Sequence, residues 1–232
     1  MPEPRGGTRR DAVATRRKLV RAALDLFTTR GYHATTTPAI AARAGVAEGT
    51  IYRHFASKEA LLNEVVREAQ RWAIGVVRDG EGEKGVRTPE RLRRIAQRLV
   101  GAAHKDAPLV RMLLRPRDDV ELDDRSREAV REFRERLTQV LATGKQDGSV
   151  RTGPADLWTG VWLALVGFAA ERVAARDWTP DHPHTEQAIE AAWDAIAWRP
   201  PTAPPAPSLP PPPGEGAPHR LPGAGSGEPG ST

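Results

Sequence analysis

Residues 36–55 restrict the fold of this chain more than any other stretch, because their spacing fits two short helices that meet at a tight turn. The stretch reads TTPAIAARAGVAEGTIYRHF. Apolar or small residues occupy the positions where two such helices must touch: Ile40, Ala41, Ala44, Val46 and Ile51. Glycine adopts the left-handed conformation that ends a helix without a Cβ penalty. We therefore predict that Thr36 caps a first helix to about Ala44, that Gly45 makes the turn, and that a second helix covers residues 48–54.

A helix, a short turn with glycine and a second helix form the DNA-binding helix-turn-helix, whose second helix enters the major groove. Thr50 and Arg53 are candidates for reading base edges, and the arginine fork suits guanine. Gly49 would let the backbone approach DNA closely. Four side chains could donate to phosphate oxygens: Thr36, Tyr52, His54 and Lys58. The alternative is a plain helical hairpin, with Tyr52 and Phe55 as core aromatic residues and His54 as an ordinary surface residue.

Positive charge is concentrated in the N-terminal part of the chain. Residues 1–79 carry 14 Lys and Arg against 8 Asp and Glu, whereas residues 80–232 carry 21 against 22. Such asymmetry favours a polyanionic partner for the N-terminal part, although solvated basic helices are also common.

Helical periodicity recurs along the rest of the 232 residues, and no segment alternates as a half-buried strand does, so we predict an all-α fold. The expected helices, besides the two above, cover about residues 11–30, 57–79, 89–100, 107–114, 125–145, 154–176 and 184–198. Ser57 is the expected N-cap of the long helix. The predicted organisation is a flexible basic arm at 1–10, a helix-turn-helix domain at 11–56, a connecting helix at 57–79, a helical domain at 80–198 and a disordered Pro/Gly-rich tail at 199–232.

The segment 154–176 differs from the other helices because it has almost no polar face. A helix that is apolar all round must be covered on several sides. It is therefore either the centre of a monomer core or part of a two-fold interface. Its longest apolar run is ten residues, 161–170, about half of what a bilayer span needs.

The composition gives catalysis little support. The chain has no cysteine, no G-x-S-x-G and no P-loop, so we predict no enzyme, catalytic residue, metal or cofactor. His182 and His184 are interpreted as a helix entry, and the acidic residues 118–124 as a solvated connection. The N-terminus lacks the apolar core of a signal peptide, and we expect a cytoplasmic protein without a membrane partner.

Residues 27–62 resemble the N-terminal signature of TetR/AcrR-type transcriptional regulators. They match F-x-x-x-G-[YF], I-A-x-x-A-G-V, G-x-[IL]-Y-x-[HY]-F and S-K-x-x-L in order and spacing. Two positions depart from that pattern. Ala47 stands where the family usually has Ser or Thr, so a hydroxyl cap and a phosphate contact are missing. Glu48 replaces a basic or neutral residue, and a Glu can accept from cytosine N4.

The resemblance implies a homodimeric repressor that binds a palindromic DNA operator and releases it when a small molecule binds the C-terminal domain. It implies pairing through the helices at 154–176 and 184–198, and a cavity among the middle helices. The candidate ligand-binding residues, for an apolar or aromatic effector, are Trp72, Leu99, His104, Arg111, Met112, Phe133, Trp158 and Trp162. The alternative is an all-helical small-molecule-binding protein or enzyme whose helix-turn-helix is vestigial.

Overall fold

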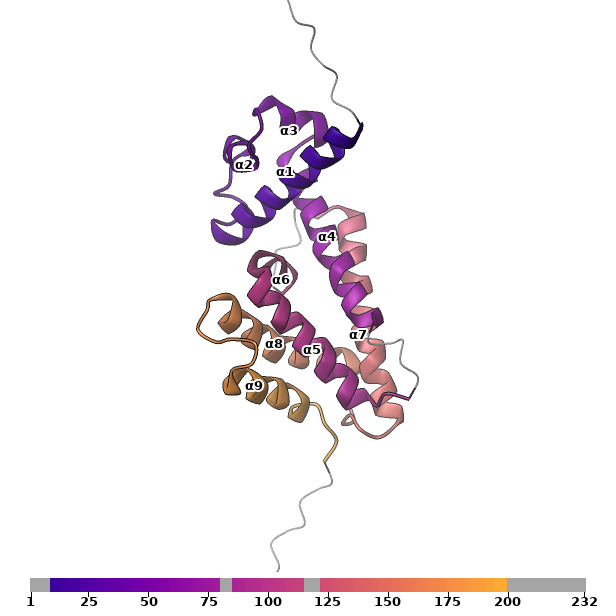
Figure 1. Cartoon of the computed structure of the whole chain (residues 1–232). Coiled ribbons are helices and arrows are strands. Elements are labelled where there is room, and N and C mark those ends of the chain that lie inside the picture. The colour runs from indigo at the N-terminus through magenta and orange to yellow at the C-terminus, as the bar shows by residue number, and fades with distance from the viewer. Residues whose placement is uncertain (1–8, 80–84, 115–121, 200–232) are drawn as a thin grey trace, which may run out of the picture. The chain divides into compact units, whose positions relative to one another are not determined.

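Nine helices make up the part of the chain that the computed structural model describes, residues 9–79, 85–114 and 122–199 (Figure 1). They are α1 (Arg9–Thr29), α2 (Thr37–Ala44), α3 (Gly49–His54), α4 (Lys58–Asp79), α5 (Thr88–Lys105), α6 (Ala107–Leu114), α7 (Asp124–Gln146), α8 (Ala155–Ala174) and α9 (Pro183–Asp194). The all-α prediction is confirmed. Helix α1 includes Arg9 and Arg10, which were expected in the arm.

Local cap chemistry sets several of these helix ends. The Thr36 side chain accepts a hydrogen bond from Ala39 N at 3.4 Å, and Ser57 Oγ accepts one from Ala60 N at 3.2 Å. Gly45 ends α2 in the left-handed region, with φ 69° and ψ 36°. The predictions for these three residues are confirmed.

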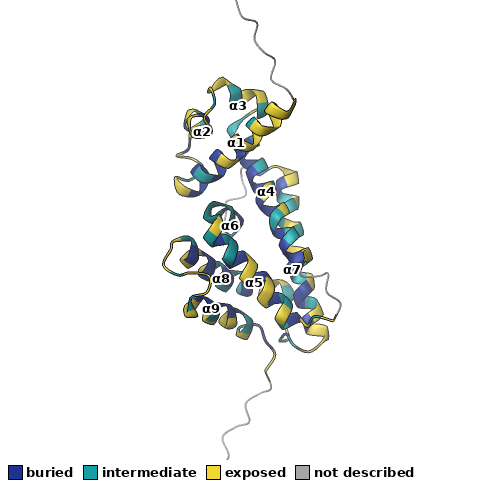
Figure 2. Cartoon of the chain, in the orientation of Figure 1, coloured by how far each residue is buried: buried dark blue, intermediate teal, exposed yellow. Residues whose placement is uncertain are grey.

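Two clusters of buried residues hold the helices together. The N-terminal core joins α1, α2, α3 and the first half of α4, and includes Met112 of α6 and Leu122. The C-terminal core joins the second half of α4 to α5, α7, α8 and α9, with Val110 and Leu113 of α6. In Figure 2 the buried residues follow the inward sides of these helices. Helices α4 and α6 therefore contribute to both cores.

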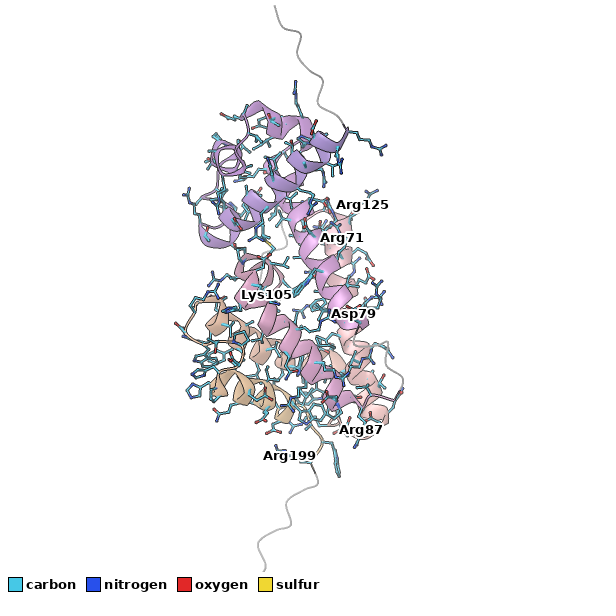
Figure 3. All side chains as sticks on the ribbon, in the orientation of Figure 1. Arg71, Asp79, Arg87, Lys105, Arg125 and Arg199 are labelled. Carbon is cyan, nitrogen blue, oxygen red and sulfur yellow. The ribbon has the colours of Figure 1, made fainter. Side chains whose placement is uncertain are left out.

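Glu64 ties α1 to α4 through a cluster of arginines. Its carboxylate is 3.1 Å from Arg16 of α1, 3.1 Å from Arg67 and 3.0 Å from Arg71, which is labelled in Figure 3. Burial raises the pKa of Glu64, but hydrogen bonds from Arg16, Arg71 and Arg67 outweigh burial and lower the pKa to about 2. Arg67 also binds Asp123, the N-cap of α7, so the cluster joins three helices.

Helix α8 is central to the C-terminal core. It packs against α5, α6, α7 and α9, with Trp162, Val166 and Val173 buried. By length and composition alone its 20 residues could cross a membrane, and no other helix in the described ranges passes that test. Core helices of soluble proteins pass the same test. The outward face stays apolar too, since Leu157 and Phe168 are 51% and 50% exposed.

The last helix ends earlier than its periodicity predicts. Helix α9 stops at Asp194, and Ala197 forms an isolated antiparallel bridge with Val150. Arg151 N donates to Ile196 O, and Trp198 N donates to Ser149 O, both at 2.9 Å. The prediction of helix to residue 198 was wrong, because a turn at Ala195 and Ile196 ends the helix and the following residues pair with the segment after α7.

Some expectations concern residues that the structure does not describe. The arm at 1–8, the loop at 80–84, most of the acidic connection, at 118–121, and the tail at 200–232 lie outside the described residues. His182 is confirmed as a helix entry, because its Nδ1 accepts from His184 N at 3.1 Å at the start of α9.

Candidate nucleic-acid interface

Buried residues fix how α3 is held. Ile40 and Ala41 of α2, Ile51 of α3 and Phe55 after it all enter the N-terminal core against α1 and the start of α4. Because the apolar positions of α3 face inward, its remaining side chains must face outward. The apolar residues that predicted contact between the two helices therefore also fix which face of α3 points outward.

The outward face of α3 carries the predicted DNA-contacting residues. Gly49 and Arg53 are exposed, Tyr52 is 57% exposed, and Thr50 and His54 are partly exposed. Because Arg53 is exposed at the end of α3, a partner can reach its guanidinium donors. Of the two aromatic residues that the plain-hairpin interpretation placed in the core, Phe55 is buried there and Tyr52 lies at the surface.

Tyr52 also connects the two helices of the motif. Its hydroxyl lies 3.2 Å from the hydroxyl of Thr37, the first residue of α2. Thr36 is exposed beside it at the N-cap position. The structure therefore brings Thr36, Thr37 and Tyr52 together on one side of the motif. Sequence reasoning missed Thr37, which the polar run TTT at 35–37 could have indicated.

Lys58 has a structural task besides the one predicted. Its ammonium donates to Tyr32 O and Thr35 O, each at 3.1 Å, and lies 4.2 Å from the centre of the Tyr32 ring. An ammonium has three N–H donors, so one remains for a phosphate. Lys58 thus fixes the loop before α2.

Tyr32 is a supporting residue that was not singled out. Its hydroxyl donates to Glu59 at 2.9 Å, and its ring packs edge-on against Phe27. The backbone N–H of Glu59 and the hydroxyls of Ser57 and Tyr32 lower the pKa of the Glu59 carboxyl. The aromatic residue after Gly31 in the signature was the available signal.

Helix α3 begins without a side-chain cap. Ala47 and Glu48 are exposed, and Glu48 occupies the N-cap position without a side-chain hydrogen bond to the helix. Only backbone bonds start the helix, from Thr50 N to Ala47 O and from Ile51 N to Glu48 O. Helix α3 therefore lacks a hydroxyl cap, as the sequence predicts. The exposed side chain of Glu48 can face a partner.

The cations of α1 divide into two groups. Arg16 and Arg21 are paired with acids, as is Arg43 of α2. Four other cations of α1 are exposed: Arg9, Arg10, Arg17 and Lys18. An exposed set of one sign attracts a polyanion over several ångströms.

The comparisons with known proteins agree with this geometry. The family model described as "Bacterial regulatory proteins, tetR family" matches residues 19–65. The HTH-type transcriptional repressor KstR2 of Rhodococcus jostii (strain RHA1) is 32% identical over 139 residues, which are 59% of this chain and 68% of that protein. The chain belongs to the TetR family.

Two further comparisons show how far the likeness extends. The HTH-type transcriptional regulator UidR of Escherichia coli (strain K12) is 33% identical over 69 residues, 30% of this chain. The chain thus spans only 35% of the length of that relative. A TetR family transcription regulator from Marinobacter aquaeolei VT8 superposes with TM-score 0.70 at 22% identity, over 83% of this chain and 100% of that one. It shows that the TetR fold extends through the C-terminal helices.

The effector-binding residues expected from the sequence do not surround one cavity. Leu99, Phe133 and Trp162 are buried in the C-terminal core, whereas Met112 is buried in the N-terminal core. These four residues are packing residues, because neighbouring side chains enclose them. The structure thus divides these four residues between two cores, and their part in effector binding stays a prediction.

The other expected effector residues lie at separate places. Trp158 covers the loop before α8, with its Nε1 donating to Thr152 O at 3.0 Å. His104 Nδ1 lies 2.7 Å from Arg176 Nη1. Trp72 lines an open cleft of about 780 Å³ with charged residues of α1, and Arg111 lines a second cleft between α6 and α8. Trp72 and Arg111 thus line two different clefts.

Proposed function

We propose that this TetR-family chain is a homodimeric repressor that binds a palindromic DNA operator with α3 and releases it when a small apolar effector binds. The observation that carries the proposal is the outward face of α3. There Arg53 is exposed and unpaired in the described part of the chain, and Tyr52, Thr50 and Gly49 lie beside it. The relative KstR2 is named as a transcriptional repressor.

Each predicted contact has a role that its geometry supports. Arg53 and Thr50 read base edges, and the exposed Glu48 accepts from cytosine N4. Thr36, Tyr52, His54 and the remaining N–H of Lys58 bind phosphates, and Gly49 allows the backbone to approach. These contacts position α3, while the exposed cations of α1 add attraction that depends on salt.

Dimerisation through α8 and α9 would bury an apolar surface that the monomer leaves in water. Leu157 and Phe168 lie eleven residues apart on α8, so they face the same side of the helix, with Ala164 also exposed between them. Burying such side chains stabilises a dimer by about 25 cal/mol per Å² of apolar area. A two-fold dimer also gives two copies of α3 for the two half-sites.

The remaining assignments follow from this role. A repressor that meets its operator and effector inside the cell acts in the cytoplasm, and needs neither a membrane nor a cofactor. The described residues contain no group of three or more metal-ligating side chains. The alternative, a carrier or enzyme with a vestigial helix-turn-helix, rested on Ala47 and Glu48. Because α3 forms and faces outward without that cap, no observation favours it.

Selection from a random DNA pool tests the assigned roles, with three versions of the full chain. Arg53→Ala should change which sequence is enriched, because it removes a base contact worth about 1–3 kcal/mol of discrimination. Tyr52→Phe should enrich the wild-type sequence and bind all DNA more weakly. An unchanged preferred sequence for Arg53→Ala, with equal loss on every sequence, would refute its base-reading role.

A further inference from the structure

A cleft of about 490 Å³ lies between α6 and α8. Seven of the nine residues that line it are apolar or small: Val110, Leu114, Leu163, Ala164, Gly167, Ala170 and Ala174. The two remaining lining residues, Arg111 and Glu171, carry opposite charges. A cleft of this volume with apolar walls and one charged group fits a small organic molecule.

The two charged residues bind each other across the cleft. Arg111 Nη2 lies 2.8 Å from Glu171 Oε1, and Arg111 Nε lies 3.1 Å from both carboxylate oxygens. The Arg111 side chain is 22% exposed and that of Glu171 is 53% exposed. The guanidinium is thus held in the wall, whereas the carboxylate stands largely in solvent.

This unequal burial makes the carboxylate replaceable. A pair with one largely exposed partner contributes little to stability, so separating Glu171 from Arg111 costs little. The planar fork of arginine binds any carboxylate in the same two-point geometry. When a ligand carboxylate replaces that of Glu171, the charge of Arg111 stays balanced. The free energy gained by burying the ligand's apolar chain then decides whether the ligand binds.

We propose that the effector is an amphipathic carboxylate, whose apolar chain fills the α6–α8 cleft and whose carboxylate replaces Glu171 on Arg111. This proposal rests on the proposed function and names the chemical class of its effector. It adds a carboxylate to the expected apolar or aromatic effector, because the described cleft has a guanidinium at its wall.

Exchange at Arg111 would also change what holds α6. The Arg111–Glu171 pair is the only ion pair or side-chain hydrogen bond between α6 and α8 within the described ranges. The other end of α6 begins after Lys105, labelled in Figure 3, where Asp106 Oδ1 accepts from Leu109 N at 3.2 Å. Helix α6 is therefore bound at both ends by charged residues.

Asp106 connects α6 to the helix-turn-helix through ion pairs. Arg21 of α1 lies 2.6 Å from Asp106 and 3.0 Å from Asp25, and Arg43 of α2 lies 3.0 Å from Asp25. A shift of α6 after exchange would therefore act on α1 and α2, which orient α3. The proposed exchange thus gives the effector a route to the DNA-binding residues.

The test measures binding of three probes to the full-length chain by isothermal titration calorimetry: decanoate, decanol and acetate. Decanoate should bind at least roughly tenfold tighter than decanol, because it alone forms charged hydrogen bonds with Arg111. Acetate should bind far more weakly than decanoate, because it has no chain to bury. Equal binding of decanoate and decanol would overturn the proposal, as would no binding of decanoate.

Two substitutions at the pair should have opposite effects on decanoate. Arg111→Gln should reduce its affinity to that of decanol. Glu171→Gln should raise it several-fold, because the competing carboxylate is gone. Glu132→Gln, which breaks the exposed pair with Arg136 on α7, is the matched control and should leave the affinity unchanged. A loss of affinity with Glu171→Gln would show that the pair is structural and would overturn the proposal.

DNA selection with Arg111→Gln separates this inference from the proposed function. The variant should enrich the same DNA as the wild type, and decanoate should no longer release it. If the wild type enriches a palindrome but does not bind decanoate, the effector class is wrong and the repressor assignment stands. If decanoate binds through Arg111 but no DNA is enriched, the site stands and the repressor assignment fails.

Discussion

Gln70 is a buried polar residue of α4 whose side-chain hydrogen bonding is incomplete. It is 2% exposed, and its Oε1 has no hydrogen-bond partner within the described residues. Asn63, two turns earlier on nearly the same side, is fully bonded: its Nδ2 donates to Glu59 O and its Oδ1 accepts from Asp123 N, each at 2.8 Å. A buried acceptor without a partner costs about 1–3 kcal/mol.

Replacing Gln70 should therefore stabilise the protein. We expect Gln70→Leu to raise the free energy of unfolding by about 1 kcal/mol, because a leucine has no acceptor to desolvate. Asn63→Leu is the matched control, and it should lower that free energy because it leaves the Asp123 N–H unpaired. Urea unfolding measures both. A less stable Gln70→Leu variant would mean that its amide has a structural partner.

The ionisation of Glu64 makes the stability of the protein depend on pH. Its pKa is lowered to about 2 from an ordinary value of 4.5, so the folded state holds the carboxylate more strongly than the unfolded chain does. The resulting stability is present above about pH 4.5 and is lost as the pH falls toward 2.

Glu64→Gln should remove this contribution. At pH 7 we expect the variant to be less stable by about 1 kcal/mol, a modest value because two of the three arginines are largely exposed. The difference between variant and wild type should shrink between pH 4.5 and pH 2. Denaturant unfolding at several pH values checks this. A difference that does not depend on pH would rule out the charged cluster as its cause.

Single residues were the hardest features to predict from the sequence. Met112 and Leu113 are neighbours in α6, yet they enter different cores. Periodicity shows which face of a helix is buried, but not which helices cover it. The expected effector residues were identified mainly by size and apolar character, and four of the eight proved to be buried in the two cores. Lys58 was predicted as a phosphate donor, and its bonds to Tyr32 and Thr35 depend on a loop fold that no local pattern encodes.

Helices were far easier to predict than their contacts, because most helix ends depend on nearby residues. Thr36, Gly45 and Ser57 are caps whose chemistry is local. The end of α9 is different, since the bridge between Val150 and Ala197 joins residues far apart in the sequence. The start of α3 shows the opposite case, in which a weak local signal is enough because Ile51 and Phe55 are buried.

The left-handed conformation of Gly45, which ends α2, can be tested by substitution. An added Cβ would meet no atom within 4 Å, so Gly45→Ala tests the backbone conformation alone. Because φ is 69°, we expect a loss of about 1–2 kcal/mol in the free energy of unfolding. Thermal unfolding should show a lower Tm.

Gly75 is the matched control for this change. It lies inside α4, where an added Cβ also meets no atom within 4 Å, and its φ is not positive. Gly75→Ala should therefore raise the stability by about 0.5–1 kcal/mol. If both substitutions shifted Tm in the same direction, the left-handed turn would not be the cause of the loss at Gly45.

At the scale of the whole molecule, three features carry the proposed function. We propose that the exposed face of α3 and the basic N-terminal part meet DNA, that the apolar outward face of α8 pairs two copies, and that the α6–α8 cleft binds an effector. The first feature could be predicted from the motif at residues 27–62, because its apolar spacing and its polar positions are local. The cleft could not, because it arises where α6 and α8 meet.

Selection of DNA by the wild-type chain at increasing salt concentration tests the central claim most directly. We expect one enriched palindrome with half-sites about one helical turn apart, and an affinity that falls steeply with salt as phosphate contacts are screened. A pool without any enriched sequence, together with retention that does not depend on salt, would contradict the assignment of α3 as a DNA-reading helix.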